Sequence, residues 1–105
     1  MFNLLSLFGL GKTKIKESLR KGAIVIDVRI PNEFDNGKVA ESINIPLERI
    51  PVNKERIKSM NRPVIFCCNS GYQSGIALRI MKEAGLKEVY NGGNWANLVK
   101  LQQKI

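Results

Sequence analysis

Histidine is absent from this 105-residue sequence. The absence excludes a Ser-His-Asp triad, a Cys-His protease pair and any zinc site with histidine ligands. Cysteine is almost as scarce, with only the adjacent pair Cys67 and Cys68, so a zinc site built from cysteines alone is excluded as well. Any chemistry must therefore use thiol, carboxylate, amine, hydroxyl or backbone groups, and the sequence implies neither a metal nor a cofactor.

Long apolar runs are also missing. Residues 1–10 are mostly apolar, but the stretch is too short to span a bilayer, and it lacks the basic start and small-residue cleavage site of a signal peptide. We expect residues 1–12 to form a short apolar segment that packs against the domain or frays, with no membrane span. The predicted location is the cytoplasm, where cysteines stay reduced.

Acidic and aromatic residues are few. Lys and Arg outnumber Asp and Glu by 17 to 9, which gives a net charge of +8, and aromatic residues make up 7%. This balance favours anionic partners, although a basic face that is simply solvated is the preferred explanation. Nucleic-acid surfaces combine basic grooves with stacking aromatics. Because the basic residues here are scattered without such aromatics, we expect no nucleic-acid partner.

The hydrophobic pattern predicts one α/β domain over residues 13–105. Residues 23–28 are a near-continuous apolar run interrupted by Asp27, and residues 64–67 are a second apolar run. Runs rich in β-branched side chains are typical of strands buried on both faces of a parallel sheet. Shorter strands are predicted at 43–45 and 88–90, with a turn at 92–93. The predicted helices are 13–21 (capped by Thr13 and ended by Gly22), 31–34, a broken helix at 47–60, 74–84 and 95–102.

The most informative segment surrounds Cys68. A buried strand ends there, and a tight loop leads from it into a helix. Ligands bind beyond the carboxyl ends of parallel strands, and loop N–H groups together with the helix dipole favour a thiolate. Adjacent residues of a strand face opposite ways, so we expect Cys67 to be inert core and Cys68 to be the nucleophile. The alternative, that both are ordinary small core residues, stays open.

The Cys68 loop resembles the active-site loop of the rhodanese family, with a catalytic Cys, a Gly three positions later (Gly71) and a closing Ser (Ser74). The resemblance runs from about residue 13 to the C-terminus and is closest to small single-domain members of the phage-shock type. It implies a rhodanese-like fold with a mostly parallel sheet of about five short strands flanked by helices. Further matching blocks, in order, are Ile26–Arg29 with Pro31, Glu33, Phe34 and Gly37, then Ile43–Leu47, then Val89 with Gly92 and Gly93.

The resemblance implies a thiosulfate sulfurtransferase. Cys68 would take the sulfane sulfur of a small anionic donor such as thiosulfate, hold it as a persulfide and pass it to cyanide or a thiol. A sulfur-relay protein is a further candidate partner. Tyr72 either lines the mouth of the site or is simply exposed. The loop residues expected to bind the donor and the persulfide are Asn69, Ser70, Gly71, Tyr72, Gln73 and Ser74.

Several positions depart from the family pattern or carry supporting roles. Gln73 stands where the family often has Arg, so thiosulfate would bind more weakly or the natural donor would differ. Asp27, Arg29 and Glu33 are expected to support the structure, with Asp27 bonding backbone near the strand end and Arg29 pairing with Glu33. Trp95 lies closer to the double glycine than the family's Trp, as a core or rim aromatic.

Two functions other than sulfur transfer are alternatives for a cysteine in such a loop. Cysteine phosphatases and arsenate reductases also use a thiolate in an anion-binding loop, but they need an Arg to clamp the oxyanion. The residue six positions after Cys68 is Ser74, so that class is disfavoured. The other rival keeps the rhodanese fold and acts as a catalytically weak sulfur carrier or a partner-binding module, an alternative that the sequence leaves open.

Overall fold

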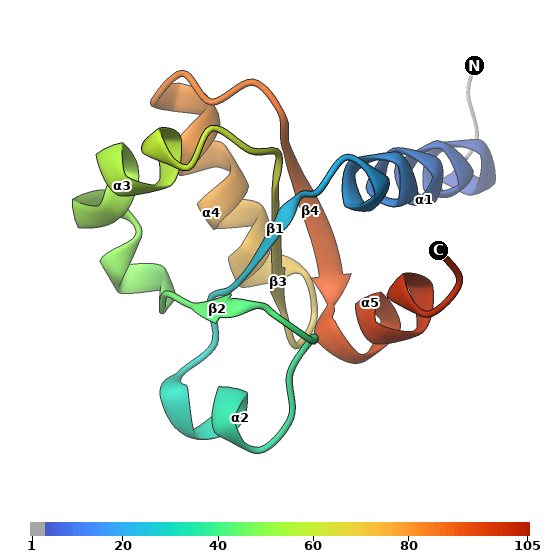
Figure 1. Ribbon diagram of the computed structural model, residues 1–105, viewed down its shortest axis with the longest axis horizontal. Helices are drawn as coiled ribbons and strands as arrows, with labels where there is room; N and C mark the ends of the chain where they lie inside the picture. Colours follow the sequence, from blue (N-terminus) through green and yellow to red (C-terminus); the bar gives the residue numbers. More distant parts are fainter. Residues whose placement is uncertain (1–3) are drawn as a thin grey trace.

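The computed structural model describes residues 4–105, with side chains from residue 11 onward. Its centre is one parallel sheet in the order β2-β1-β3-β4 (Figure 1). The strands are β1 (Ile24–Asp27), β2 (Ile43–Asn44), β3 (Val64–Cys68) and β4 (Val89–Asn94). All four strands run in the same direction, so their carboxyl ends lie at one end of the sheet.

Helices cover both sides of this sheet. The pair α1 and α5 lies on one side, while α3 and α4 lie on the other, and α2 sits beyond the carboxyl end of β1 (Figure 1). The bounds are α1 (Leu4–Arg20), α2 (Pro31–Asp35), α3 (Lys54–Ser59), α4 (Tyr72–Glu83) and α5 (Trp95–Gln102), with 3₁₀ turns η1 (Leu47–Arg49) and η2 (Pro51–Asn53) before α3. No helix within residues 4–105 is both long and apolar enough to cross a membrane.

The core is divided in two by β3, whose five residues are all buried. Phe66 and Cys68 face the side covered by α4, where they join Ala77 and Met81. Ile65 and Cys67 face the other side, where they join Ile15 of α1 and Leu98 of α5. This alternation follows from the pleat of the strand, which sends successive side chains to opposite faces. It places the two cysteines in separate halves of the core, as the sequence predicts.

The α/β fold with a parallel sheet is confirmed, with four strands among the described residues where about five were predicted. Two local predictions are wrong. Thr13 does not begin a helix, because α1 begins at Leu4 and includes most of the predicted apolar segment; residues 1–3 lie outside the described part. Gly92 and Gly93 lie within β4 instead of forming a turn, because a bulge absorbs the extra residue beside β3.

Candidate active site at the Cys68 loop

The site is built on the sulfur of Cys68, the last residue of β3. The backbone N–H of Gly71 donates to Cys68 Sγ at 3.0 Å, and that of Ser74 points at the same atom from 3.5 Å. The Ser74 hydroxyl lies 3.3 Å from Sγ. The thiol is 2% exposed, so these groups replace the water that would otherwise surround it. Two backbone N–H groups and one hydroxyl grouped at one sulfur form a polar cradle for negative charge.

The loop can close around the sulfur because of Gly71. This residue has φ +93°, a left-handed conformation that only glycine adopts readily, and it stands immediately before α4. A Cβ at this position would also lie 3.4 Å from the Cα of Gly93 in β4. Gly71 therefore turns the loop so that its own N–H and the first turn of α4 point at Cys68.

The two cysteines have opposite pKa shifts. Burial opposes ionisation of Cys68, but hydrogen bonds from the Ser74 side chain and from the backbone N–H groups of Ser74, Gly71 and Ser70 outweigh it and lower the pKa of this thiol. Burial and the nearby Asp27 carboxylate raise the pKa of Cys67 instead. A thiolate is the reactive form of cysteine. Cys68 can therefore act as a nucleophile, whereas Cys67 stays a neutral core thiol.

Asn91, which the sequence analysis did not single out, holds the loop from β4. Its Nδ2 donates to Gly71 O at 2.9 Å, and its Oδ1 accepts from Ser74 Oγ at 2.7 Å and from Gly93 N at 2.9 Å. A hydroxyl has one proton, so Ser74 donates either to Asn91 or to the sulfur. Asn91 therefore sets the resting orientation of the hydroxyl that meets the thiolate.

Asn94 braces the start of the same loop. Its Nδ2 donates to Asn69 O at 2.7 Å, while its Oδ1 caps α5 by accepting from Asn97 N at 3.0 Å. The available sequence signal was the pair of Asn residues enclosing Gly92 and Gly93 at the end of a predicted strand. Side chains at the carboxyl end of β4 reach the loop after β3 because the two strands are parallel neighbours.

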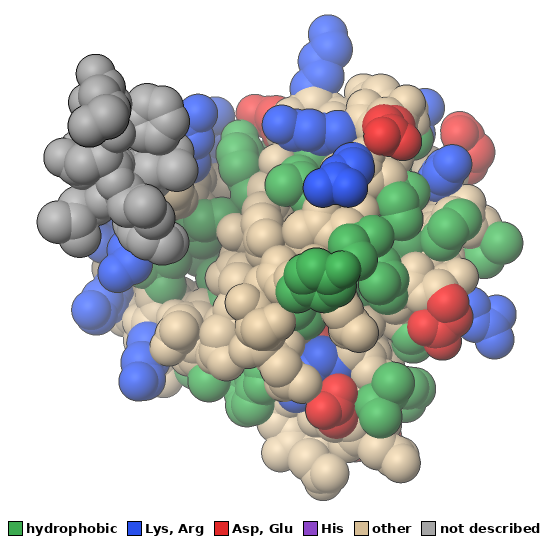
Figure 2. Space-filling view, turned by 180° about the vertical axis from the view of Figure 1, so that it is seen from behind, with side chains coloured by type: hydrophobic (Ala, Val, Ile, Leu, Met, Phe, Trp, Pro, Cys, Tyr) green, Lys and Arg blue, Asp and Glu red, His purple; other side chains and the backbone are tan. Residues whose placement is uncertain are grey.

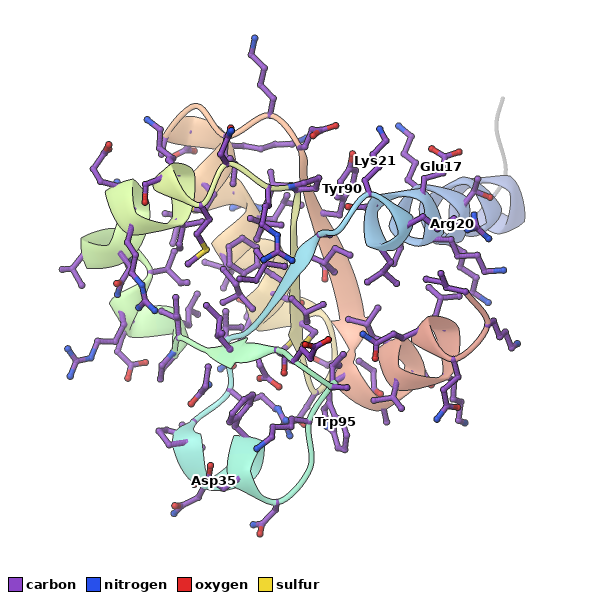
Figure 3. All side chains as sticks on the ribbon, viewed as in Figure 1. Glu17, Arg20, Lys21, Asp35, Tyr90 and Trp95 are labelled. Carbon is purple, nitrogen blue, oxygen red and sulfur yellow. The ribbon has the colours of Figure 1, made fainter. Side chains whose placement is uncertain are left out.

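A buried ion pair lies behind the loop. Arg29 donates to both carboxylate oxygens of Asp27, with Nη2 to Oδ2 at 2.7 Å, and its backbone N–H donates to Oδ1 at 2.9 Å. Its guanidinium also donates to the Gly37 carbonyl and lies 4.7 Å from the centre of the Trp95 ring (Figure 3). The predicted backbone bond of Asp27 is thus confirmed. The predicted Arg29–Glu33 pair is wrong, because Asp27 is nearer on the same strand end.

The remaining predicted residues divide into two groups. Glu33 belongs to the loop's rim, since its Oε2 accepts from Asn69 Nδ2 at 3.0 Å. Tyr72 and Gln73 are exposed at the start of α4, and the backbone N–H of Tyr72 is directed at Ser70 Oγ instead of the sulfur. The structure therefore gathers Ser70, Gly71 and Ser74 around Cys68 and leaves the Tyr72 and Gln73 side chains outside the cradle. Within residues 4–105 no cluster of acidic or Cys side chains could hold a metal ion.

Comparison with known families agrees with this geometry. Residues 12–94 match the Rhodanese-like domain, a range that covers all four strands and the whole Cys68 loop. This chain belongs to the rhodanese family.

Two related sequences and one solved structure illustrate the relationship. The chain is 35% identical to the uncharacterized protein YqhL of Bacillus subtilis, over 88% of this chain and 78% of that protein. It is 42% identical to the thiosulfate sulfurtransferase PspE of Escherichia coli, over 65% of this chain and 66% of that protein. It resembles the structure of a rhodanese with anions from E. coli, with a TM-score of 0.63 and 38% identity, over 72% of this chain and 91% of that one.

One feature of this rhodanese loop is its lack of a cationic side chain at Gln73. The positive potential at the sulfur comes from backbone N–H groups, from the Ser74 hydroxyl and from the N-terminus of α4. A helix N-terminus carries about half a positive charge. These fixed dipoles do not depend on a flexible side chain, so the cradle is preorganised for a sulfur anion.

Proposed function

We propose that this protein is a sulfurtransferase that moves sulfane sulfur through a persulfide on Cys68. The observation that carries the proposal is the cradle of N–H and O–H groups on Cys68 Sγ, together with its lowered pKa. The rhodanese relationship and the relative named as a thiosulfate sulfurtransferase support it. The expected location is the cytoplasm, in keeping with two free thiols.

In the first half-reaction the Cys68 thiolate attacks the outer sulfur of thiosulfate. The new S–S bond forms as the bond to the inner sulfur breaks, and sulfite leaves with that electron pair. The terminal sulfur of the persulfide then carries the negative charge. The N–H groups of Gly71 and Ser74 stabilise this charge in the same way that an oxyanion hole stabilises an alkoxide.

In the second half-reaction an acceptor attacks the terminal sulfur. Cyanide would leave as thiocyanate and a thiol as a persulfide, and in both cases Cys68 returns to the thiolate. Two half-reactions through a covalent intermediate predict ping-pong kinetics. Gln73 removes one cation from the donor site, so we expect a high KM for thiosulfate and better use of donors that do not need that charge.

Intact-mass measurement after incubation with thiosulfate tests the proposal. We expect wild type and Cys67→Ser to gain the mass of one sulfur atom and to lose it on addition of cyanide, with thiocyanate released. Cys68→Ser should gain nothing. If wild type stays unmodified with thiosulfate and with polysulfide, the sulfurtransferase proposal is wrong. Slow thiocyanate turnover with full persulfide formation would identify a sulfur carrier.

A further inference from the structure

A groove of about 710 Å³ runs along β4, between α1 and α5. At one end it is lined by Ser70 and Gly71, which belong to the Cys68 loop. Its wall is the strand from Asn91 to Asn94, and the two helices form its sides. The groove therefore reaches the outer surface of the same loop whose inner surface holds the reactive sulfur.

The strand that forms this wall is a free edge of the sheet. Among residues 4–105, β4 pairs with β3 and with no second strand. Asn91 is exposed and Gly92–Asn94 are half-buried, and a Cβ built on Gly93 would meet no atom within 4 Å. An edge strand presents N–H and C=O groups that an extended polypeptide can pair with. The sheet thus has both the edge and the space for an added strand.

The sides of the groove are basic and its floor is apolar. Lys12 of α1 and Lys100 and Lys104 at the C-terminus line it, above Ile15 and Leu98. Residues 89–105 contain no Asp or Glu. The single acidic residue among the described α1 side chains, Glu17, points away from α5 (Figure 3).

The same asymmetry is visible on the surface. Figure 2 shows Lys and Arg side chains along the side formed by α1 and α5. The Asp and Glu side chains visible in this view lie on other parts of the surface. A charged groove of one sign selects partners of the opposite sign. The groove is therefore complementary to a segment that is acidic on its outer side and apolar on its inner side.

We propose that this groove binds an extended acidic segment of a protein that exchanges sulfur with Cys68, and that the segment adds to β4 as a strand. This inference rests on the proposed sulfur transfer. Main-chain pairing along the edge favours a polypeptide over a small anion, and alternation along a strand turns every second side chain toward α1 and α5, where acidic side chains would meet the lysines. Binding there holds the partner beside the Cys68 loop.

The first test uses an alternating Glu/Val heptapeptide carrying a fluorescein label, followed by fluorescence anisotropy with the full chain. We expect saturable binding that weakens with salt. The triple variant Lys12→Glu, Lys100→Glu, Lys104→Glu should bind about tenfold more weakly, because several ion pairs are reversed together. The control Lys54→Glu, Lys82→Glu, Lys87→Glu makes the same change of net charge at one half-buried and two exposed positions outside the groove and should bind within about twofold of wild type.

A second variant tests whether peptide binding needs the open volume of the groove. A Cβ at Gly11 of α1 would meet no atom within 4 Å, so Gly11→Trp can fold while its ring fills the groove. We expect it to abolish peptide binding and to leave the alkylation rate of Cys68 unchanged. Hydrogen exchange should show that bound peptide slows the amides of Asn91–Asn94 other than that of Gly93, which already donates to Asn91 Oδ1. Cys68→Ser should bind the peptide normally, which separates docking from sulfur transfer.

Four results would overturn the inference. These are equal binding of a Lys/Val heptapeptide, equal loss in the control triple variant, unchanged β4 amide exchange with bound peptide, or a concentration-dependent dimer that protects β4 and identifies a second copy as the occupant. Loss of persulfide formation in wild type with peptide binding intact would instead contradict the proposed sulfur transfer alone.

Discussion

Cys67 and Cys68 share a peptide bond and have opposite surroundings. Cys68 Sγ accepts hydrogen bonds from N–H groups of the loop, whereas Cys67 is fully buried near the carboxylate of Asp27. A fixed dipole pointing its positive end at a sulfur favours the thiolate, and an apolar site or a nearby anion disfavours it. The pleat of one strand and the loop that follows it therefore give the two thiols opposite pKa shifts.

The pH dependence of alkylation measures this difference. We expect Cys68 to react with iodoacetamide with a midpoint below the ordinary cysteine pKa of about 8.5, because hydrogen bonds from Ser74 and the loop amides stabilise its thiolate. Ser74→Ala should move the midpoint upward. Ser70→Ala, which removes a hydroxyl but keeps the backbone N–H, is the matched control and should leave it in place; an equal shift in both variants would contradict the role of the Ser74 hydroxyl.

The same shift contributes to stability. The folded-state pKa of Cys68 lies below that of the unfolded chain, so ionisation stabilises the fold fully above the unfolded pKa. The contribution disappears as the pH falls through the folded-state pKa. The free energy of unfolding of wild type should therefore decline relative to Cys68→Ser as the solution is acidified through that range, as measured by urea unfolding at several pH values. A pH-independent difference would contradict the lowered pKa.

The Asp27–Arg29 pair gives a second prediction for single residues. Both side chains are buried, at 0% and 4% exposure, so Asp27→Asn leaves a buried guanidinium without its anion. We expect a loss of about 3 kcal/mol in unfolding free energy, measured by urea denaturation. Glu55→Gln, which removes a carboxylate from the exposed Lys58 pair, is the control and should have no measurable effect. If Asp27→Asn also left the unfolding free energy nearly unchanged, the contacts of Arg29 with Trp95 and Gly37 would be sufficient to hold it without the Asp27 carboxylate.

At the scale of elements, the register between β3 and β4 brings Asn91 and Asn94 to the loop. Phe66 pairs with Asn91 and Cys67 with Gly93, so Gly92 bulges out of the ladder. A Cβ on Gly92 would lie 2.7 Å from Ile65 Cγ2 and 3.1 Å from Leu98 Cδ2. Only glycine lets α5 pack this closely on the bulge.

Gly92→Ala should therefore cost about 1–3 kcal/mol of unfolding free energy through overpacking, again measured by urea denaturation. It should also lower the rate of persulfide formation, because Asn91 and Asn94 would shift with the strand. Gly11→Ala, in an open position of α1, is the matched control and should stabilise slightly, since alanine favours helix. If Gly92→Ala changed neither the unfolding free energy nor the rate of persulfide formation, α5 would be able to move without disturbing the loop.

Local patterns predicted most of these elements. The β-branched runs at 23–28 and 64–67 gave β1 and β3 nearly to the residue, and the predicted helix at 95–102 coincides with α5. Cys68 was identified because a strand, a tight loop and a helix follow one another along the chain, and Gly71 and Ser74 because this loop resembles the rhodanese loop. Such signals depend on neighbours in sequence, which is why they could be read without a structure.

Contacts between distant segments could not be predicted in this way. Asn91 and Asn94 reach the loop only through the pairing of β3 with β4, and their residue types alone suggest turns. Arg29 had two carboxylates within reach in sequence, Asp27 and Glu33, and only the fold shows that the first is the partner. The extension of α1 to Leu4 escaped prediction because Gly9 and Gly11 weaken the helical pattern.

At the scale of the whole molecule, the net charge of +8 should speed the approach of anions. Iodoacetate and iodoacetamide alkylate the same thiol and differ in charge. We expect the rate with iodoacetate at Cys68 to fall several-fold between low and high salt as the charges are screened, while the rate with neutral iodoacetamide stays nearly constant. Equal salt dependence of both reagents would show that the charge lies too far from the site to guide a donor.

Because Cys67 and Cys68 lie on opposite faces of the central strand β3, the labelling rates of the two thiols report different properties of the protein. β3 is paired on both edges, by β1 and by β4, and Cys67 lies on it at 0% exposure. Cys67 faces α1 and α5, the two terminal helices, so we expect its labelling to require these helices to separate from the sheet. In one reaction mixture, the labelling rate of Cys68 reports the ionisation of that thiol, and the labelling rate of Cys67 reports the opening of this side of the core.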